Sequence, residues 1–154
     1  YFLKHYKVEK IDSSKADKKE LEGLVLKWKS QKEKEDKEEE KENMECEPYL
    51  KFIKSGFPGC QISKVLLVNG KTAAVFAGWK IPNSNTFYPH MSIKDYDYKG
   101  LGEYTSLEIF SEAKKAGFEK LDFGGSDKEL LIFKKRFHPE SIYKAYNFTM
   151  VKNK

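Results

Sequence analysis

Three β-type runs follow one another between positions 62 and 93, and the turn joining the first two constrains the fold most. That turn is Asn69-Gly70, a strong signal for a two-residue hairpin, because both positions must adopt a positive φ. The flanking runs, Ile62 to Val68 and Lys71 to Ile81, are rich in β-branched and aliphatic residues. A third run, Thr86 to Ile93, extends the pair to an antiparallel meander. Pro89 inside it predicts a bulge or an interrupted ladder, because proline has no N–H to donate.

Apolar spacing of the helical kind stands on both sides of the meander. Before it, a short strand at Tyr6 to Ile11 precedes a helix capped by Ser13 or Ser14, with apolar residues three and four apart. A second helix starts near Pro48, which suits a first helical position. After the meander, helical spacing resumes at Gly100-Leu101-Gly102 and stops at Gly117.

The second half alternates strands and helices. A short strand from Phe118 to Phe123 follows the third helix, and Ser126 with Glu129 forms a capping box for a helix from Leu130 to Phe137. A last strand runs from Ile142 to Val151. A helix between two strands implies a parallel pair. We therefore predict an α/β (α+β) fold with a mixed central sheet, combining an antiparallel meander with a parallel pair and helices on both faces.

The composition suits one domain over residues 1–154. The chain has 11 Phe, 9 Tyr and 2 Trp, enough large apolar side chains to build a core. Residues 29–47 differ, since most of them are Lys, Glu or Asp of alternating sign. We expect an exposed helical extension or a loop there.

The charge balance leaves the partner open. The formal net charge is +5, from 29 basic and 24 acidic residues. It permits an anionic partner, such as a phosphate-bearing cofactor, tRNA or a lipid headgroup, but a solvated mixed-charge surface explains it equally well. Cys46 and Cys60 are expected to be free thiols, and no residue spacing suggests a metal site. No apolar run approaches the roughly 20 residues that span a bilayer, and we expect a cytoplasmic protein.

Gly100-Leu101-Gly102 is the first candidate site. Two glycines at a helix start let the backbone approach a ligand, and the free N–H groups there suit a pyrophosphate or carboxylate. An ordinary glycine-rich turn is the alternative. Gly124-Gly125-Ser126, at the next helix start, is a second candidate at the carboxyl end of a strand, where a tight turn with an N-cap would also suffice.

Two further groups carry titratable side chains. Phe133-Lys134-Lys135-Arg136 could turn one cation towards a phosphate, or simply complement the dipole of its helix. Tyr88-Pro89-His90 lies in the irregular strand, and the ordinary pKa of histidine near neutrality suits a base. A structural histidine is the alternative for His90.

Taken together, the motifs resemble the GNAT superfamily. More closely, the chain is similar to the uncharacterised proteins related to the C-terminal domain of phosphatidylglycerol lysyltransferase, and to Fem-type aminoacyltransferases. The residues that carry this resemblance are Trp28-Lys29, Val68-Asn69-Gly70-Lys71, His90-Met91-Ser92-Ile93-Lys94-Asp95, Tyr98-Lys99-Gly100-Leu101-Gly102-Glu103-Tyr104, Asp122-Phe123-Gly124-Gly125-Ser126 and Phe133-Lys134-Lys135-Arg136-Phe137-His138-Pro139. Members typically carry two GNAT-like halves. This chain resembles the second half, which implies a preceding half.

The resemblance implies an acyl donor, either acyl-CoA (acetyl-CoA) or aminoacyl-tRNA, along a splayed strand and against the helix start. Donor contacts are then expected from Tyr98, Lys99, Gly100, Leu101 and Gly102, and Lys134 matches the family's basic position. Acetyl-CoA users carry an R/Q-x-x-G-x-G/A run. In that register Asp97 replaces the usual Arg or Gln, which leaves the donor open.

The expected activity is transfer of an acyl or aminoacyl group to an amine or hydroxyl of a small molecule or lipid headgroup. His90 or Glu103 would take the proton, and Tyr88, Gly125, Ser126 and Arg136 would contact the acceptor. Two alternatives stay open: a non-catalytic GNAT-fold module within a tandem protein, and nucleic-acid binding by the basic surface. The sequence does not indicate the oligomeric state.

Overall fold

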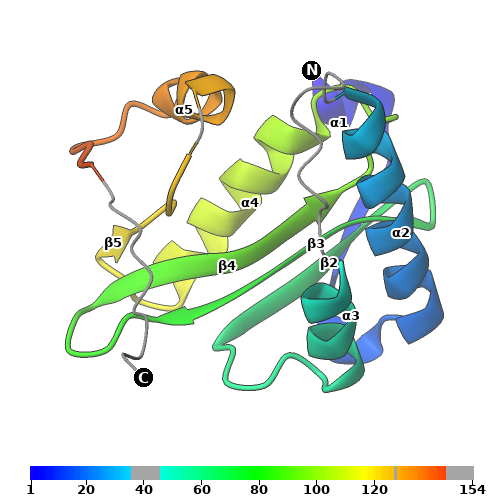
Figure 1. Cartoon of the computed structure of the whole chain (residues 1–154), viewed down its shortest axis with the longest axis horizontal. Coiled ribbons are helices and arrows are strands. Elements are labelled where there is room, and N and C mark those ends of the chain that lie inside the picture. The colour runs from blue at the N-terminus through cyan, green and yellow to red at the C-terminus, as the bar shows by residue number, and fades with distance from the viewer. Residues whose placement is uncertain (36–45, 127, 145–154) are drawn as a thin grey trace, which may run out of the picture. The chain divides into compact units, whose positions relative to one another are not determined.

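The computed structural model describes residues 1–35, 46–126 and 128–144 (Figure 1). They fall into two compact units, residues 1–122 and the described part of residues 123–154. The first unit contains the whole sheet and the second contains one helix.

The sheet of the first unit has five strands in the order β1-β2-β3-β4-β5. The first four pair antiparallel in sequence, and β5 is parallel to β4. This arrangement confirms the predicted mixed sheet. The strands are β1 (Val8–Asp12), β2 (Ile62–Val68), β3 (Lys71–Lys80), β4 (Thr86–Lys94) and β5 (Lys120–Leu121).

Helices lie in both units. The first unit has α1 (Phe2–His5), the 3-10 turn η1 (Ser13–Lys15), α2 (Lys18–Glu35), α3 (Glu47–Lys54) and α4 (Leu101–Lys115); α5 (Lys128–Lys135) is in the second. The predicted cap of α2 is wrong. Ser13 and Ser14 lie in η1, and the Asp17 carboxylate accepts from the Lys19 and Glu20 N–H groups at 2.7 and 3.3 Å instead. The short helix α1 carries no periodic signal in the sequence.

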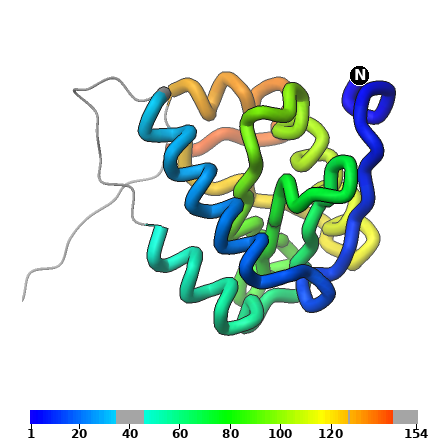
Figure 2. Tube along the Cα trace, turned by 90° about the vertical axis from the view of Figure 1, so that its right-hand side faces the viewer, coloured from blue at the N-terminus to red at the C-terminus, as the bar shows by residue number. Residues whose placement is uncertain are grey.

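Two hydrophobic cores lie on opposite faces of the sheet. One packs α2 and α3 on the sheet, with Leu21, Val25 and Ile53 fully buried. The other packs α1 and α4 on the opposite face, through residues such as Phe2 and Ile109. Figure 2 shows α2 and α3 side by side. The prediction of helices on both faces is confirmed.

The proline in β4 coincides with a bulge, as predicted. Ala77 is opposite Met91, and Trp79 is opposite Tyr88, so that Gly78 faces the two residues Pro89 and His90. A Cβ on Gly78 would lie 2.2 Å from the Tyr88 carbonyl oxygen. Glycine at position 78 is therefore what lets the bulged strand lie this close.

Other expectations differ in extent. The Asn69-Gly70 turn has φ values of 52° and 78°, as its hairpin requires, whereas the predicted strand at 118–123 shortens to β5. Residues 142–144 are not in a strand, and 145–151 lie outside the described residues. The helix predicted from Leu130 begins at Lys128. Position 127 also lies outside the described residues, so the capping box of Ser126 and Glu129 stays a prediction.

Candidate functional site

The neighbouring strands β4 and β5 share only a short ladder. Thr86 pairs with Lys120 and Phe87 with Leu121, and the Asp122 N–H donates to the Phe87 carbonyl at 2.9 Å. In the described part of the chain, β4 from Tyr88 to Lys94 has β3 as its only strand neighbour. Among the strands of the described residues, none covers the other edge of β4 from the bulge onwards, and this edge is called the uncovered edge of β4.

The uncovered edge ends near the start of α4. Gly100 is the N-cap and has a φ of 86°, a left-handed conformation that glycine adopts at little cost. The Leu101 side chain is 1% exposed and belongs to the core, so only its backbone faces a ligand there. Glu103 is in the first turn and Lys99 is exposed.

Gly102 leaves room for a lysine. The Lys94 Cε lies 3.1 Å, and its Nζ 3.9 Å, from where a Cβ on Gly102 would be. Burial lowers the pKa of Lys94, as does the positive charge of Lys32, while the charge of Glu103 acts in the opposite direction. The Lys94 Nζ also lies 5.7 Å from the centre of the Tyr96 ring. A cation therefore stands beside the first turn of α4, where a phosphate would suit it.

The turn before α4 is tied to α2. The Lys27 Nζ lies 2.6 Å from carboxylate oxygens of both Asp95 and Asp97. The Gln31 amide donates to the same two carboxylates at 3.0 Å, and its carbonyl accepts from the Tyr96 N–H at 3.0 Å. Burial acts to raise the pKa of Asp95, but hydrogen bonds from Lys27 and Gln31 hold it below its ordinary value.

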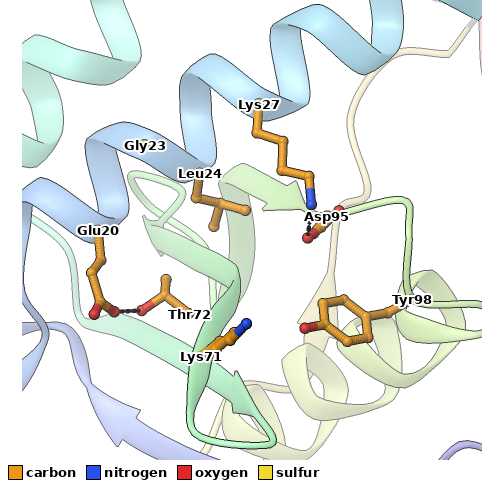
Figure 3. Close-up of a pocket in the computed structure, with 8 residues that line it drawn as sticks. All are labelled: Glu20, Gly23, Leu24, Lys27, Lys71, Thr72, Asp95 and Tyr98. Carbon is orange, nitrogen blue, oxygen red and sulfur yellow. Dashed lines mark hydrogen bonds and ion pairs between the residues drawn. The ribbon is translucent and has the colours of Figure 1, made fainter.

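A hollow of about 490 Å³ lies beside this turn, between α2 and the start of β3 (Figure 3). The Lys71 ammonium and the Tyr98 hydroxyl point towards each other across it, and Thr72 donates to Glu20 at 2.6 Å on its wall. Tyr98 also packs edge-on against Tyr6, with ring centres 5.5 Å apart. Tyr98 therefore lines the same hollow as the residues of α2.

His90 belongs to a cluster of rings at the bulge. It is stacked on Trp79 with ring centres 4.5 Å apart, and Phe52 of α3 lies edge-on to it at 5.7 Å. Tyr88 lies 6.3 Å from both Trp79 and His90. His90 is exposed, whereas the other three are half-buried. A ligand at the bulge would therefore contact the His90 imidazole, which is stacked on the Trp79 indole.

The second unit holds the remaining predicted site residues. The Lys134 ammonium donates to the carbonyl oxygens of Phe123, Gly124 and Gly125 at 2.5, 3.3 and 2.9 Å. Gly125, Ser126 and Arg136 are exposed. Lys134 thus braces the Gly124-Gly125 loop.

Comparison with solved structures decides the fold. An aminoglycoside acetyltransferase from an uncultured soil metagenomic sample superposes with a TM-score of 0.66, at 15% identity over 99% of this chain and 100% of that one. The C-terminal domain of a putative lysylphosphatidylglycerol synthetase from Agrobacterium fabrum gives 0.59, at 16% identity over 88% of this chain and 47% of that one. The ribosomal-protein-S18-alanine N-acetyltransferase from Escherichia coli gives 0.57, at 14% identity over 86% and 76%. The chain has the GNAT fold.

The shared fold confirms the GNAT part of the resemblance, and the lysylphosphatidylglycerol synthetase domain is among the matches. The resemblance to Fem-type aminoacyltransferases stays a prediction. No protein-family model matches the sequence, and neither does any curated protein. Among the helices of the described ranges, none is long and apolar enough to cross a bilayer. Nor do three or more His, Cys, Asp or Glu side chains gather as metal ligands within those ranges.

Within its GNAT fold, the first unit brings some predicted residues together. Tyr98 to Glu103 form one continuous turn and helix start. Tyr88 and His90 lie in the ring cluster with α3, whereas Gly102 lies against Lys94 beside α4. The two candidate bases, His90 and Glu103, therefore stand in different surroundings.

Several residues of the site escaped prediction from sequence. Trp79 and Phe52 look like ordinary core residues, and only the fold places them beside His90. Lys27 and Gln31 meet the Asp95 turn across 64 to 68 residues. Their i, i+4 spacing, which puts both on one face of a helix, is the one signal that could have linked them.

Proposed function

We propose that the chain is a GNAT-type acyltransferase that moves an acyl or aminoacyl group to an amine or hydroxyl. The observation that carries this proposal is the uncovered edge of β4 between the bulge and the start of α4. An extended donor can lie along such an edge and bond to its backbone groups. The acetyltransferases that share the fold support the same reaction class.

The residues present fit the phosphate-bearing part of a donor. Gly100 and Gly102 let the backbone come close, and the ammonium of Lys94 stands beside the first turn of α4. Lys99 is exposed next to them, and Tyr98 lines the adjoining hollow. These side chains would hold acyl-CoA (acetyl-CoA) or the 3′ end of an aminoacyl-tRNA. The bound donor supplies an activated thioester or ester carbonyl.

The acceptor would approach at the bulge. Its amine or hydroxyl attacks the donor carbonyl directly, and the C–S or C–O bond to the donor breaks. Backbone N–H groups near the irregular part of β4 would stabilise the oxyanion. His90 takes the proton from the acceptor, because it is exposed and Trp79 fixes its ring. Glu103 is the second candidate base.

The bulge also bears on the class of acceptor. A small molecule or a lipid headgroup with an amine or hydroxyl fits a bulge lined by Tyr88 and His90. Gly125, Ser126 and Arg136, which lie in the second unit, stay candidate acceptor contacts predicted from the sequence alone. We place the reaction in the cytoplasm, with either donor.

Calorimetry with both donors tests the proposal. The 154-residue chain should bind acetyl-CoA or an aminoacyl-tRNA. Lys99→Ala should weaken that binding, and its circular dichroism spectrum should match that of the wild type. Absence of binding by this chain, and by any longer protein that contains it, would overturn the proposal.

The alternative is a non-catalytic GNAT-fold module in a tandem protein. The bracing of the Gly124-Gly125 loop by Lys134 favours it, because that lysine has a structural role without any donor. Lys134→Ala would then destabilise the second unit, and no turnover would be measured in any variant.

A further inference from the structure

The turn between β4 and α4 carries two aspartates just before the glycines of the proposed donor site. Asp95 is 6% exposed, and Asp97 lies three residues before Gly100. Asp97 occupies the position where the acetyl-CoA motif carries Arg or Gln. If a donor's phosphates bind at Gly100 to Gly102, a carboxylate three residues earlier in the chain would repel them unless its charge were offset.

The helix α2 supplies an offsetting charge. The Lys27 Nζ lies 2.6 Å from an oxygen of each aspartate, and hydrogen bonds to Asp95 and Asp97 raise the pKa of Lys27, which keeps it charged. Gln31 spans the turn with three hydrogen bonds of 3.0 Å, one to each carboxylate and one from the Tyr96 N–H. The Asp97 N–H closes the turn on Asp95 at 3.1 Å.

We propose that Lys27 and Gln31 are positioning residues of the donor site. Together they fix the 95–97 turn, and Lys27 offsets one of the two negative charges that its aspartates would present to a donor's phosphates. The inference rests on the proposed function. It gives α2 a role in donor binding in addition to its packing on the sheet.

A purely structural role explains the network less well. The Lys27 side chain is 45% exposed and that of Asp97 is 68% exposed. Ion pairs of that exposure contribute little to folding. The α2 helix is already anchored by Leu21, Leu24 and Val25, which are almost completely buried. The pairing of Lys27 with Asp97 thus adds more to the local charge balance than to the stability of the fold.

The decisive experiment measures donor binding by calorimetry with wild type and Lys27→Gln. The probes are acetyl-CoA, S-acetylpantetheine, which lacks the phosphates, and a short single-stranded RNA ending in CCA. Lys27→Gln should weaken binding of the phosphate-bearing probe that wild type recognises by about tenfold. Binding of S-acetylpantetheine should stay unchanged. Comparison of the affinities for acetyl-CoA and for the RNA shows which of the two phosphate-bearing donors the site binds.

Second-site variants separate charge from structure. Lys27→Arg should bind like wild type, because it keeps the cation. Adding Asp97→Asn to Lys27→Gln should restore at least about threefold of the lost affinity, since it removes one uncancelled charge. Lys29→Gln is the matched control on the same helix, because the Lys29 ammonium lies 3.6 Å from the Glu33 carboxylate, one turn further along α2. It should leave every affinity unchanged.

The outcomes are distinct. Equal binding of the phosphate-bearing probe by wild type and Lys27→Gln overturns this inference alone. Equal loss with S-acetylpantetheine, or no recovery in the double variant, also overturns it, because both indicate general disorder of the turn. If Lys27→Gln does not fold, Gln31→Glu, which adds a third negative charge, must weaken the phosphate-bearing probe selectively. Binding of no probe by the wild-type chain, and by any longer protein that contains it, overturns the proposed function and this inference with it.

Discussion

At the scale of single residues, Gly78 at the bulge and Gly23 in α2 differ in the space that is available for a side chain. A Cβ on Gly78 would meet the Tyr88 carbonyl at 2.2 Å and the Pro89 Cα at 2.9 Å, both backbone atoms that cannot move aside alone. Gly23, in the middle of α2, has nothing within 4 Å of the same position. The first glycine is required by packing, whereas the second costs the helix conformational entropy.

We therefore expect opposite effects from the same substitution. Gly78→Ala should lower the free energy of unfolding by about 2 to 3 kcal/mol, because the bulged strand must shift. Gly23→Ala should raise it by about 0.5 to 1 kcal/mol. Urea unfolding followed by circular dichroism measures both. A neutral Gly78→Ala would mean that β3 and β4 lie further apart than described.

The two candidate bases can be separated by kinetics. His90→Ala should lower kcat by about 10² to 10⁴, the usual contribution of a general base, with unfolding unchanged because His90 is exposed. Glu103→Gln should then have a small effect. The reverse order would assign the proton transfer to Glu103, and the stacking of His90 on Trp79 would be structural only.

At the scale of elements, α4 is fastened to the edge of the sheet by charge as well as by its core residues. The Lys10 ammonium of β1 bonds to Glu108 and to Glu112, the latter at 2.7 Å, and both glutamates are on α4. Burial acts to raise the pKa of Glu112, but hydrogen bonds from Lys10 and Lys115 and the charges of Lys10 and Lys64 bring it below its ordinary value.

This lowered pKa gives stability a defined pH dependence. The stabilisation by Glu112 is complete above its ordinary value of 4.5 and is lost as the pH falls below it, towards the folded-state pKa. Glu112→Gln should lower the free energy of unfolding by about 1 kcal/mol at pH 7. The variant should then lose less stability than the wild type as the pH falls below 4.5. Thermal unfolding from pH 7 to 3 measures this. An equally steep loss in the variant would show that other carboxylates, such as Asp95, dominate.

Elements with strong local patterns are those that the sequence predicts well. β2 has the predicted bounds because β-branched residues end at an Asn-Gly turn, and Pro89 marks the bulge because it has no N–H. α1 is too short to show a period, and Asp17 rather than Ser13 caps α2 because η1 comes first. Of the site, the glycine turn was predictable. The lysine beside Gly102 was not, because it follows from how β4 packs on α4.

At the scale of the whole molecule, the mild positive charge must be weighed against a specific site. The net charge of +5 is spread over many residues of both signs. Such a surface attracts RNA only through counterion release, which salt reverses steeply. A compact donor such as acetyl-CoA touches few cations.

Salt titration therefore distinguishes the donors. If acetyl-CoA is the donor, its affinity should fall only modestly between 50 and 200 mM salt, as it would release few counterions (about 3 at most). If an aminoacyl-tRNA is the donor, its affinity should fall far more steeply over the same range. Fluorescence anisotropy with labelled ligands gives both slopes. A steep slope for RNA together with no effect of Lys27→Gln would favour general nucleic-acid binding over a donor site.

The contact between α2 and the turn before α4 bears on how such chains can diverge. Lys27 and Asp97 stand 70 positions apart in the sequence, yet each makes the charge of the other acceptable. We expect substitutions at the two positions to be correlated: a relative with Arg or Gln at position 97 should keep the lysine at 27 only where Asp95 is also present. Covariation at this pair would then sort homologues by how they hold the donor, before any substrate is known.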